Sequence, residues 1–163
     1  MTAGDLHQGR FEGRVAFEQL VRDALACAAA EGWREIVLSD ADFADWPLGE
    51  RAVAQSLQDW AASGRRCILL ARRWDAVVRR HARFVQWRQA WSHLIEARGC
   101  ASADPLELPS ALWSPAWVLQ RLDPDRCTGV CGREPERRVA VREQLDAWLL
   151  KSSPAFAATT LGL

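Results

Sequence analysis

The sequence of 163 residues contains no tyrosine, only three histidines and no net charge. It also lacks an uninterrupted apolar run near the roughly 18 residues that a membrane-spanning helix needs. The N-terminus does not show the basic segment followed by an apolar one that marks a secretory signal. These absences predict a protein that neither crosses a membrane nor is exported, so we expect a cytoplasmic location and no membrane partner.

Cysteine is present, but not in the even number of a small disulfide scaffold. The five cysteines are scattered, and residues 127–131 show C-x-x-x-C spacing rather than the C-x-x-C of redox and zinc motifs. In a regular strand, residues four apart are separated by roughly 13 Å, which is too far for a disulfide. No histidine lies nearby, since His7, His81 and His93 are distant in sequence. We therefore predict buried, reduced thiols, no metal site and no cofactor.

Lysine is almost absent: the sequence contains one lysine, Lys151, and twenty arginines. This ratio is typical of a GC-rich genome. The charges are unevenly spread along the chain. Residues 31–59 carry seven acidic residues against two arginines, whereas residues 65–98 carry nine arginines against two acidic residues. The interpretation we favour is that these two segments pair with each other. The alternative is that the basic segment meets phosphate or an acidic partner.

Apolar residues alternate between helical and strand spacing, which predicts a mixed α/β domain. An apolar fraction of 49% is enough for one core. We expect a flexible leader over residues 1–14, a single domain over residues 15–163, and a long irregular connection over residues 99–115, which hold three prolines. The predicted helices lie around 17–31, 53–61, 74–91 and 135–151, and the predicted strands are 34–39, 66–71, 92–98, 116–122 and 126–131.

The strand, helix, strand order over residues 34–71 favours a parallel pair with a right-handed crossover, so both strands end at one edge of the sheet. Open α/β sheets usually bind ligands at this edge. The candidate ligand-binding residues are Asp40, Asp42, Arg72, Arg73 and His81. A phosphorylated ligand would match these side chains. Ion pairs at the loop ends, with His81 as a surface or capping residue, are the interpretation we favour over a site.

Nine tryptophans are unusual for a chain of this length. Some fall on predicted apolar helix faces and are expected in the core, namely Trp60, Trp87, Trp91 and Trp148. Others lie near loops or strand ends and are candidates for exposure, namely Trp46, Trp74, Trp113 and Trp117. Exposed indoles beside arginines suit a protein interface, or the stacking of single-stranded nucleic acid. The candidate nucleic-acid contacts are Arg79, Arg80 and Arg83.

Residues 116–123 have the layout of a His-x-Lys-x-x-x-x-Asp motif without its His or Lys. The matching positions hold Ala116 and Val118, and Asp123 is retained. The order of the predicted elements over about residues 15–155 resembles one half of a phospholipase-D-like domain. More narrowly, it is similar to a bacterial branch of that superfamily in which the motif is generally absent. The segments that carry the resemblance are 36–39, 62–66, 67–71, the region near Ile95, and 145–153.

The resemblance implies a mixed β-sheet flanked by helices. In active members the His attacks phosphorus, the Lys holds phosphate oxygens, and two motifs meet across a pseudo-dimer interface. Ala116 and Val118 supply neither group, so the resemblance implies no catalytic residue and no phosphodiester hydrolysis by this mechanism. The expected function is a protein-binding or assembly module, with an unidentified protein partner or a second copy in a homodimer. The alternatives are a phosphorylated small ligand at the strand edge and, less favoured, nucleic acid along residues 65–88.

Overall fold

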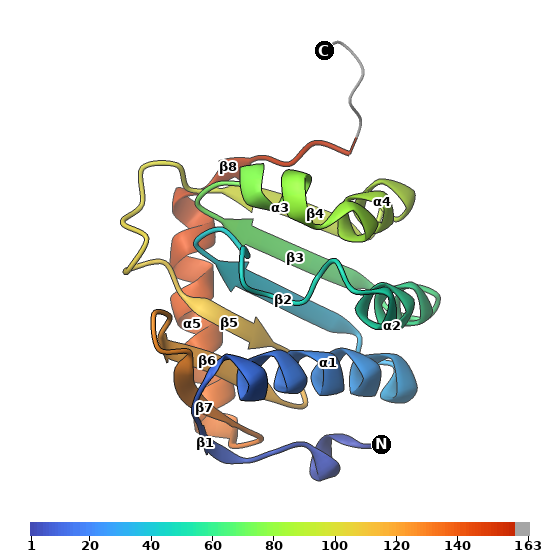
Figure 1. Ribbon diagram of the computed structural model, residues 1–163, viewed down its shortest axis with the longest axis vertical. Coiled ribbons are helices and arrows are strands. Elements are labelled where there is room, and N and C mark those ends of the chain that lie inside the picture. Colours follow the sequence, from blue (N-terminus) through green and yellow to red (C-terminus); the bar gives the residue numbers. More distant parts are fainter. Residues whose placement is uncertain (159–163) are drawn as a thin grey trace.

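The computed structural model describes residues 1–158, which fold around one mixed sheet of eight strands. The strands lie in the order β1-β7-β6-β5-β2-β3-β4-β8 (Figure 1). Their bounds are β1 Gly9–Phe11, β2 Glu35–Asp40, β3 Arg66–Ala71, β4 Ile95–Gly99, β5 Ser110–Trp113, β6 Val118–Asp123, β7 Thr128–Gly132 and β8 Ser153–Pro154. The predicted mixed sheet flanked by helices is confirmed. The end of the predicted domain, residues 159–163, lies outside the described residues.

The helices cover the two faces of the sheet unequally. Figure 1 shows α1 to α4 in front of the sheet and α5 behind it. Their bounds are α1 Arg14–Glu31, α2 Arg51–Ala61, α3 Asp75–Arg80, α4 Ala82–Ala90 and α5 Pro135–Lys151, with a short 3-10 turn at Ala3–Asp5. None of the helices within residues 1–158 is both long and apolar enough to cross a membrane.

The strands β2, β3 and β4 form the parallel half of the sheet. β2 pairs with β3 from Glu35 opposite Arg66 to Asp40 opposite Ala71, and β4 lies parallel along the other edge of β3. Parallel neighbours need a long crossover, which α2 supplies between β2 and β3, and α3 with α4 between β3 and β4. The predicted parallel pair is confirmed, so β2 and β3 end at the same edge.

The antiparallel half begins at β5, in the segment 99–115 for which we predicted an irregular connection. β5 pairs antiparallel with β2 on one side and with β6 on the other, and β6 and β7 form the predicted pair of strands. The prediction missed β5 because it is only four residues long and prolines flank it at Pro109 and Pro115. β5 is therefore the strand that joins the parallel and antiparallel halves.

Side chains of β2 are buried on both faces of the sheet. Ile36 and Leu38 belong to the main core with α1 and α2, whereas Val37 packs with Val141 and Leu145 of α5. A strand that is covered on both faces reads as a continuous apolar run rather than as an alternating one. This explains why residues 34–39 were recognisable from the sequence.

The prediction of a flexible leader over residues 1–14 was wrong. Gly9–Phe11 forms β1, which pairs antiparallel with β7 at the edge of the sheet. Leu6 is buried, and the indole N–H of Trp117 donates to the carbonyl of His7 at 3.0 Å. A few apolar anchors in a polar segment have no periodicity, so the sequence pattern did not reveal them.

The tryptophans near loops are more buried than expected. Trp46, Trp74 and Trp117 are buried, and Trp113 is partly exposed. Trp46 packs edge-on against Phe43, with 4.9 Å between the ring centroids. The loops fold back over the ends of the sheet, so a position near a strand end did not mean exposure.

Gly129 of β7 allows a close approach to β6 and β1. A Cβ atom at this position would clash with the carbonyl oxygen of Gln120 and lie 2.9 Å from the Phe11 ring. We expect Gly129→Ala to lower the free energy of unfolding by about 1–3 kcal/mol, because the backbone must shift. Urea unfolding followed by tryptophan fluorescence measures this loss.

Asp125→Ala in the exposed turn beside Gly129 is the matched control. It should change the free energy of unfolding by less than about 0.5 kcal/mol. Equal stability of the two variants would contradict a tight approach of the strands at Gly129.

Candidate functional site

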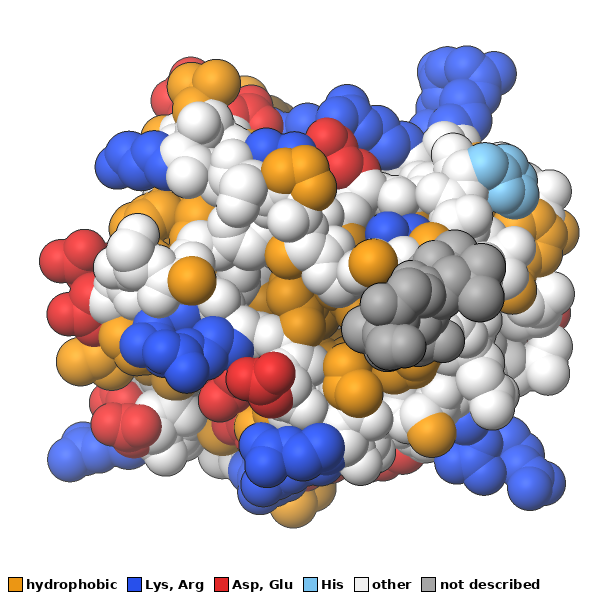
Figure 2. All heavy atoms as spheres, turned by 90° about the horizontal axis from the view of Figure 1, so that it is seen from above, with side chains coloured by type: hydrophobic (Ala, Val, Ile, Leu, Met, Phe, Trp, Pro, Cys, Tyr) orange, Lys and Arg blue, Asp and Glu red, His pale blue; other side chains and the backbone are white. Residues whose placement is uncertain are grey.

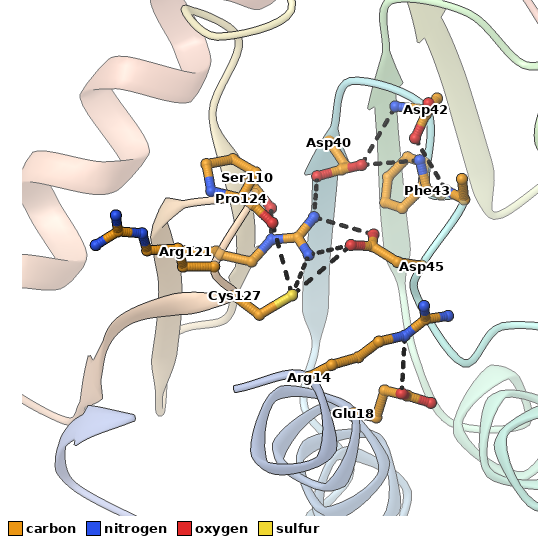
Figure 3. A network of polar contacts seen from close by, with 12 residues as sticks. Arg14, Glu18, Asp40, Asp42, Phe43, Asp45, Ser110, Arg121, Pro124 and Cys127 are labelled. Atoms are coloured by element: carbon orange, nitrogen blue, oxygen red, sulfur yellow. Dashed lines mark hydrogen bonds and ion pairs between the residues drawn. The ribbon is translucent and has the colours of Figure 1, made fainter. Parts of the chain in front are cut away.

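Buried charged side chains meet where β2, β5 and β6 lie side by side (Figure 3). Arg121 of β6 points into the main core, and its side chain is 2% exposed. Ser110 lies opposite Arg121 on β5, and Asp40 is the last residue of β2. Asp45 comes from the loop that follows β2. Three strands and one loop thus contribute to this group.

The Arg121 guanidinium uses all five of its N–H donors. Nε donates to Ser110 Oγ at 3.0 Å, and Nη2 donates to Asp40 Oδ1 at 2.9 Å and Asp45 Oδ1 at 3.1 Å. Nη1 donates to Asp45 Oδ2 at 2.6 Å and lies 3.3 Å from Cys127 Sγ. Because a guanidinium carries five donors in a rigid fork, this arrangement fixes both its position and its orientation.

Burial by itself would lower the pKa of Arg121, but the hydrogen bond to Asp45 and the charges of Asp40 and Asp45 outweigh it and raise that pKa. The guanidinium therefore stays charged. Asp40 Oδ2 accepts hydrogen bonds from the amides of Asp42 and Phe43, at 3.2 and 2.8 Å. The ion pair between Arg121 and Asp40 thereby holds the start of the loop after β2.

A hollow of about 300 Å³ opens over this group. Its wall includes the carboxylates of Asp40, Asp42, Asp45 and Asp125, the guanidinium of Arg121, and the apolar side chains of Pro105, Leu106 and Leu108. Carboxylates outnumber the guanidinium, so the hollow is acidic. An acidic wall attracts a cationic group and repels the phosphorylated ligand that was the alternative prediction for this edge.

The structure does not bring the five predicted ligand-binding residues together. Asp40 and Asp42 border the acidic hollow, whereas Arg72 and Arg73 border a separate hollow of about 310 Å³ beside β4. Nε of Arg72 donates to the carbonyl of Ala103 at 2.9 Å. The strands share an edge as expected, but Asp40 turns toward the antiparallel half while Arg72 follows β3 toward β4.

His81 lies at neither hollow; it occupies the cap position between α3 and α4, as the capping alternative of the prediction expected, but its ring is buried rather than at the surface. The predicted helix over 74–91 is divided at this residue, where φ is −121° and ψ is 60°. The ring is buried, with Nε2 at 2.8 Å from the carbonyl oxygen of Phe43. The break between α3 and α4 turns the imidazole inward, and the contact with Phe43 ties this break to the loop after β2.

The acidic segment 31–59 and the basic segment 65–98 do not neutralise each other as we expected. Glu35 and Arg66, at 3.9 Å, form the ion pair between the two segments in the part of the chain that the structure describes. The other arginines paired with the acidic segment are Arg22, Arg121 and Arg142. Most of the acidic segment is therefore neutralised from elsewhere, and the basic segment retains an excess of charge.

The predicted nucleic-acid contacts Arg79, Arg80 and Arg83 are exposed on α3 and the start of α4. None of them forms an ion pair within residues 1–158, and Arg83 Nη1 donates to the carbonyl of Gly49 at 2.8 Å. Figure 2 shows basic side chains around the margin of this end of the molecule, with apolar side chains near its centre. The unpaired arginines therefore remain available to solvent.

The five cysteines are buried and form no disulfide, as predicted. Burial raises the pKa of the Cys27 and Cys131 thiols to about 12, and it also raises the pKa of Cys67. Cys127 is distinct, because its Sγ contacts the Arg121 guanidinium and its backbone φ is 53°. In residues 1–158, no three His, Cys, Asp or Glu side chains are grouped so that they could hold a metal ion.

The positions that match the phospholipase-D motif belong to separate packing clusters. Val118 is fully buried between the sheet and α5, whereas Ala116 packs, partly buried, against the main core. Asp123, at the end of β6, lies 3.9 Å from Arg126 in an exposed ion pair. The side chains at the matched positions are therefore used in packing and in a turn.

Sequence reasoning missed Arg121 and Asp45 as members of the buried group. Arg121 does carry a signal, since it interrupts an apolar strand at the inward position two residues after Leu119, and a buried arginine requires a partner. Its partners were not recognisable, because Asp45 and Asp40 lie 76 and 81 residues earlier in the chain. Only the folded sheet brings them together.

No family model and no curated protein matches the chain. A solved structure of TrmBL2, an archaeal chromatin protein, is similar with a TM-score of 0.65 and 14% identity. The match covers 93% of this chain and 55% of that chain, so this chain spans about half the length of TrmBL2. The likeness is one of fold. It supports the α/β architecture, and the DNA binding described for TrmBL2 is a property of that protein.

The buried group makes the stability of the fold depend on Arg121. We expect Arg121→Ala to lower the free energy of unfolding by about 3–5 kcal/mol, because Asp40 would stay buried without its counter-ion. Asp45→Asn should cost less, since Asp45 is 29% exposed and Asp40 keeps its partner. Chemical denaturation measures these losses.

Arg126→Ala is the matched control, because Arg126 lies on the adjoining turn and its side chain is 84% exposed. It should cost less than about 1 kcal/mol. If Arg121→Ala were as stable as Arg126→Ala, the buried ion pair would not stabilise the junction of β2, β5 and β6.

Proposed function

We propose that this chain is a non-catalytic phospholipase-D-like module that binds a protein partner through the outer side of α5. The observation that carries the proposal is an apolar hollow of about 300 Å³ at the N-terminal end of α5. Its apolar wall consists of Trp113, Pro115, Pro135 and Val139. Val139 is 57% exposed, and an aromatic side chain beside prolines and an exposed valine is typical of a protein-binding pocket.

A second exposed apolar residue, Leu150, lies further along the helix, beyond the charged Glu143 and Asp146. Leu150 is 89% exposed and lies about three helical turns after Val139, so both side chains are on the same side of α5. We call the hollow and Leu150 together the α5 surface. Apolar areas rimmed by charged residues, here Arg138 and Glu143, usually mark interaction sites.

Side chains that could take part in catalysis are used for structural contacts, which supports a binding role. Arg121, Asp40 and His81 are each engaged in buried contacts that hold strands and loops together. The positions of the catalytic His and Lys in the resemblance hold Ala116 and Val118. A homodimer is the first assembly to test, because the resemblance implies that two such halves pair.

Sedimentation equilibrium on the purified protein tests this proposal. We expect the mass of two chains, or of one chain with a stoichiometric partner from its own host. Val139→Asp and Leu150→Asp place a carboxylate in the contact and should weaken association by at least about tenfold, since a buried unpaired charge is costly.

The matched control is Val15→Asp on α1, at a position that is 82% exposed and lies on the other side of the sheet. It should leave association unchanged. Association that survives Val139→Asp and Leu150→Asp at full strength, or is lost equally with Val15→Asp, would refute the α5 surface as the contact.

A second candidate function is nucleic-acid binding along α3 and α4. The observation that favours it is the exposure of Arg79, Arg80 and Arg83 without an ion-pair partner among residues 1–158. Arginines on one surface bind phosphates irrespective of base sequence. The fold neighbour TrmBL2 is a chromatin protein with a novel mode of DNA binding, which is in keeping with this candidate.

Fluorescence anisotropy with a labelled DNA duplex at several salt concentrations tests the second candidate. Affinity should fall steeply with salt, and replacing Arg79, Arg80 and Arg83 together by Gln should reduce the logarithmic salt slope by about 2–3. The control replaces the exposed Arg34, Arg126 and Arg133 by Gln, which removes the same charge elsewhere. Identical slopes for the two triple variants would reject a specific basic surface on α3 and α4.

A further inference from the structure

Arg88 of α4 is a buried arginine without a carboxylate partner among residues 1–158. It is 7% exposed, and its Nε donates to the carbonyl oxygen of Phe156 at 3.1 Å. Its Nη1 is buried and has no hydrogen-bond acceptor in the described part of the chain. Burial lowers the pKa of Arg88, in contrast to Arg121, whose carboxylates raise it. A buried guanidinium with unused donors is unfavourable unless an anion reaches it.

The ring of Phe156 lies over Arg88 in a slot with aromatic walls. It stacks on Trp74 with 4.7 Å between ring centroids and an interplanar angle of 20°. The Phe84 ring is also nearly parallel to the Phe156 ring, with 6.4 Å between the ring centroids. The Arg88 guanidinium is 5.8 Å from the centroid of the Phe156 ring. The slot therefore combines flat apolar walls with one positive charge.

The segment that carries Phe156 makes few contacts with the sheet. β8 consists of two residues, and the next backbone contact is the amide of Ala155, which donates to Ala97 at 3.1 Å. Phe156 is only partly buried, and its φ of 49° is in the left-handed region that aromatic residues disfavour. This segment follows α5 in the chain and crosses the top of the molecule in Figure 1, which is the end that Figure 2 shows from above. Its release would leave the central strands paired.

We propose that this slot is a binding site for an aromatic carboxylate, and that Phe156 fills it as a displaceable plug. Phe156 offers Arg88 a single neutral acceptor, its carbonyl oxygen. A carboxylate in the same place has two oxygens, which accept from Nε and Nη2 together, because these two N–H groups lie on the same side of the guanidinium and favour bidentate binding. The ring attached to that carboxylate takes the place of the Phe156 ring against Trp74 and Phe84.

The charge of the slot favours a carboxylate over a phosphate. Arg88 supplies one positive charge, which one carboxylate neutralises. A phosphate dianion would leave a negative charge uncompensated among Trp74, Phe84 and Trp87, where its desolvation would be costly. The slot is built from the residue before α3, from α4 and from the segment after β8, so it is independent of the α5 surface.

Phe156→Ala empties the slot, and isothermal titration with 3-phenylpropionate tests it directly. We expect the variant to bind 3-phenylpropionate at least about tenfold more tightly than its neutral amide, because charge-assisted bidentate hydrogen bonds are stronger than neutral ones. The unchanged protein should bind more weakly than Phe156→Ala, since the plug competes. Equal affinities for acid and amide, or no saturable binding, would overturn the proposal.

A second variant assigns the preference to Arg88. Adding Arg88→Gln to Phe156→Ala should remove the preference for the acid, whereas adding Arg83→Gln, on the same helix but exposed, should keep it. Loss of the preference with both additions would contradict a role for Arg88. Circular dichroism checks folding, and if Arg88→Gln unfolds the chain, the acid and amide affinities of Phe156→Ala alone decide.

The same assay distinguishes two sources of the carboxylate. An acetylated tetrapeptide that ends in phenylalanine carries the ring and the carboxylate at a chain terminus. Tighter binding of this peptide than of 3-phenylpropionate supports the carboxyl end of a partner chain as the ligand, whereas tighter binding of 3-phenylpropionate supports a small aromatic acid.

Discussion

The ion pair between Arg121 and Asp40 crosses β5 and links the two halves of the sheet by a buried side-chain contact. Asp40 ends β2 of the parallel half, and Arg121 lies on β6 of the antiparallel half. Both side chains are almost fully buried, so each charge is tolerated only beside the other. The second oxygen of Asp40 accepts from the amides at the start of the following loop, and the carbonyl oxygen of Phe43 in that loop lies 2.8 Å from Nε2 of His81. One buried contact thereby positions the acidic hollow, the loop and the break between α3 and α4.

The acidic and basic segments of this chain are neutralised to different extents. The buried or half-buried carboxylates of the acidic segment are neutralised by arginines from other elements, and α3 and α4 keep their arginines exposed. Arg88 is the contrast, because it is buried without a carboxylate among residues 1–158. Arg121 and Arg88 have comparable burial by exposed surface, yet only Arg121 is surrounded by acceptors. That difference makes Arg121 a structural residue and Arg88 a candidate binding residue.

The sequence predicted the elements that have a local signal. The continuous apolar runs of β2 and β3, the helix that ends at Gly32 with φ 64°, and the helix that starts at Pro135 were all recognisable, because burial and capping act within a few residues. β1 and β5 were missed, since strands of three and four residues are stabilised by their neighbours in the sheet. The burial of the His81 ring was not predicted, because the break between α3 and α4 at this residue turns the side chain inward.

The sequence by itself determined the α/β class, the parallel pair, the burial of the cysteines, and the presence of alanine and valine at the two positions of the resembled motif. These properties depend on residue type and on short-range periodicity. The tertiary structure alone decided which charges meet: Arg121 took Asp40 and Asp45, Arg72 and Asp42 came to separate hollows, and Arg88 remained without a carboxylate among the described residues. The reason is physical, since a buried ion pair depends on the distance between two side chains in space, and strand pairing sets that distance across gaps of up to 81 residues.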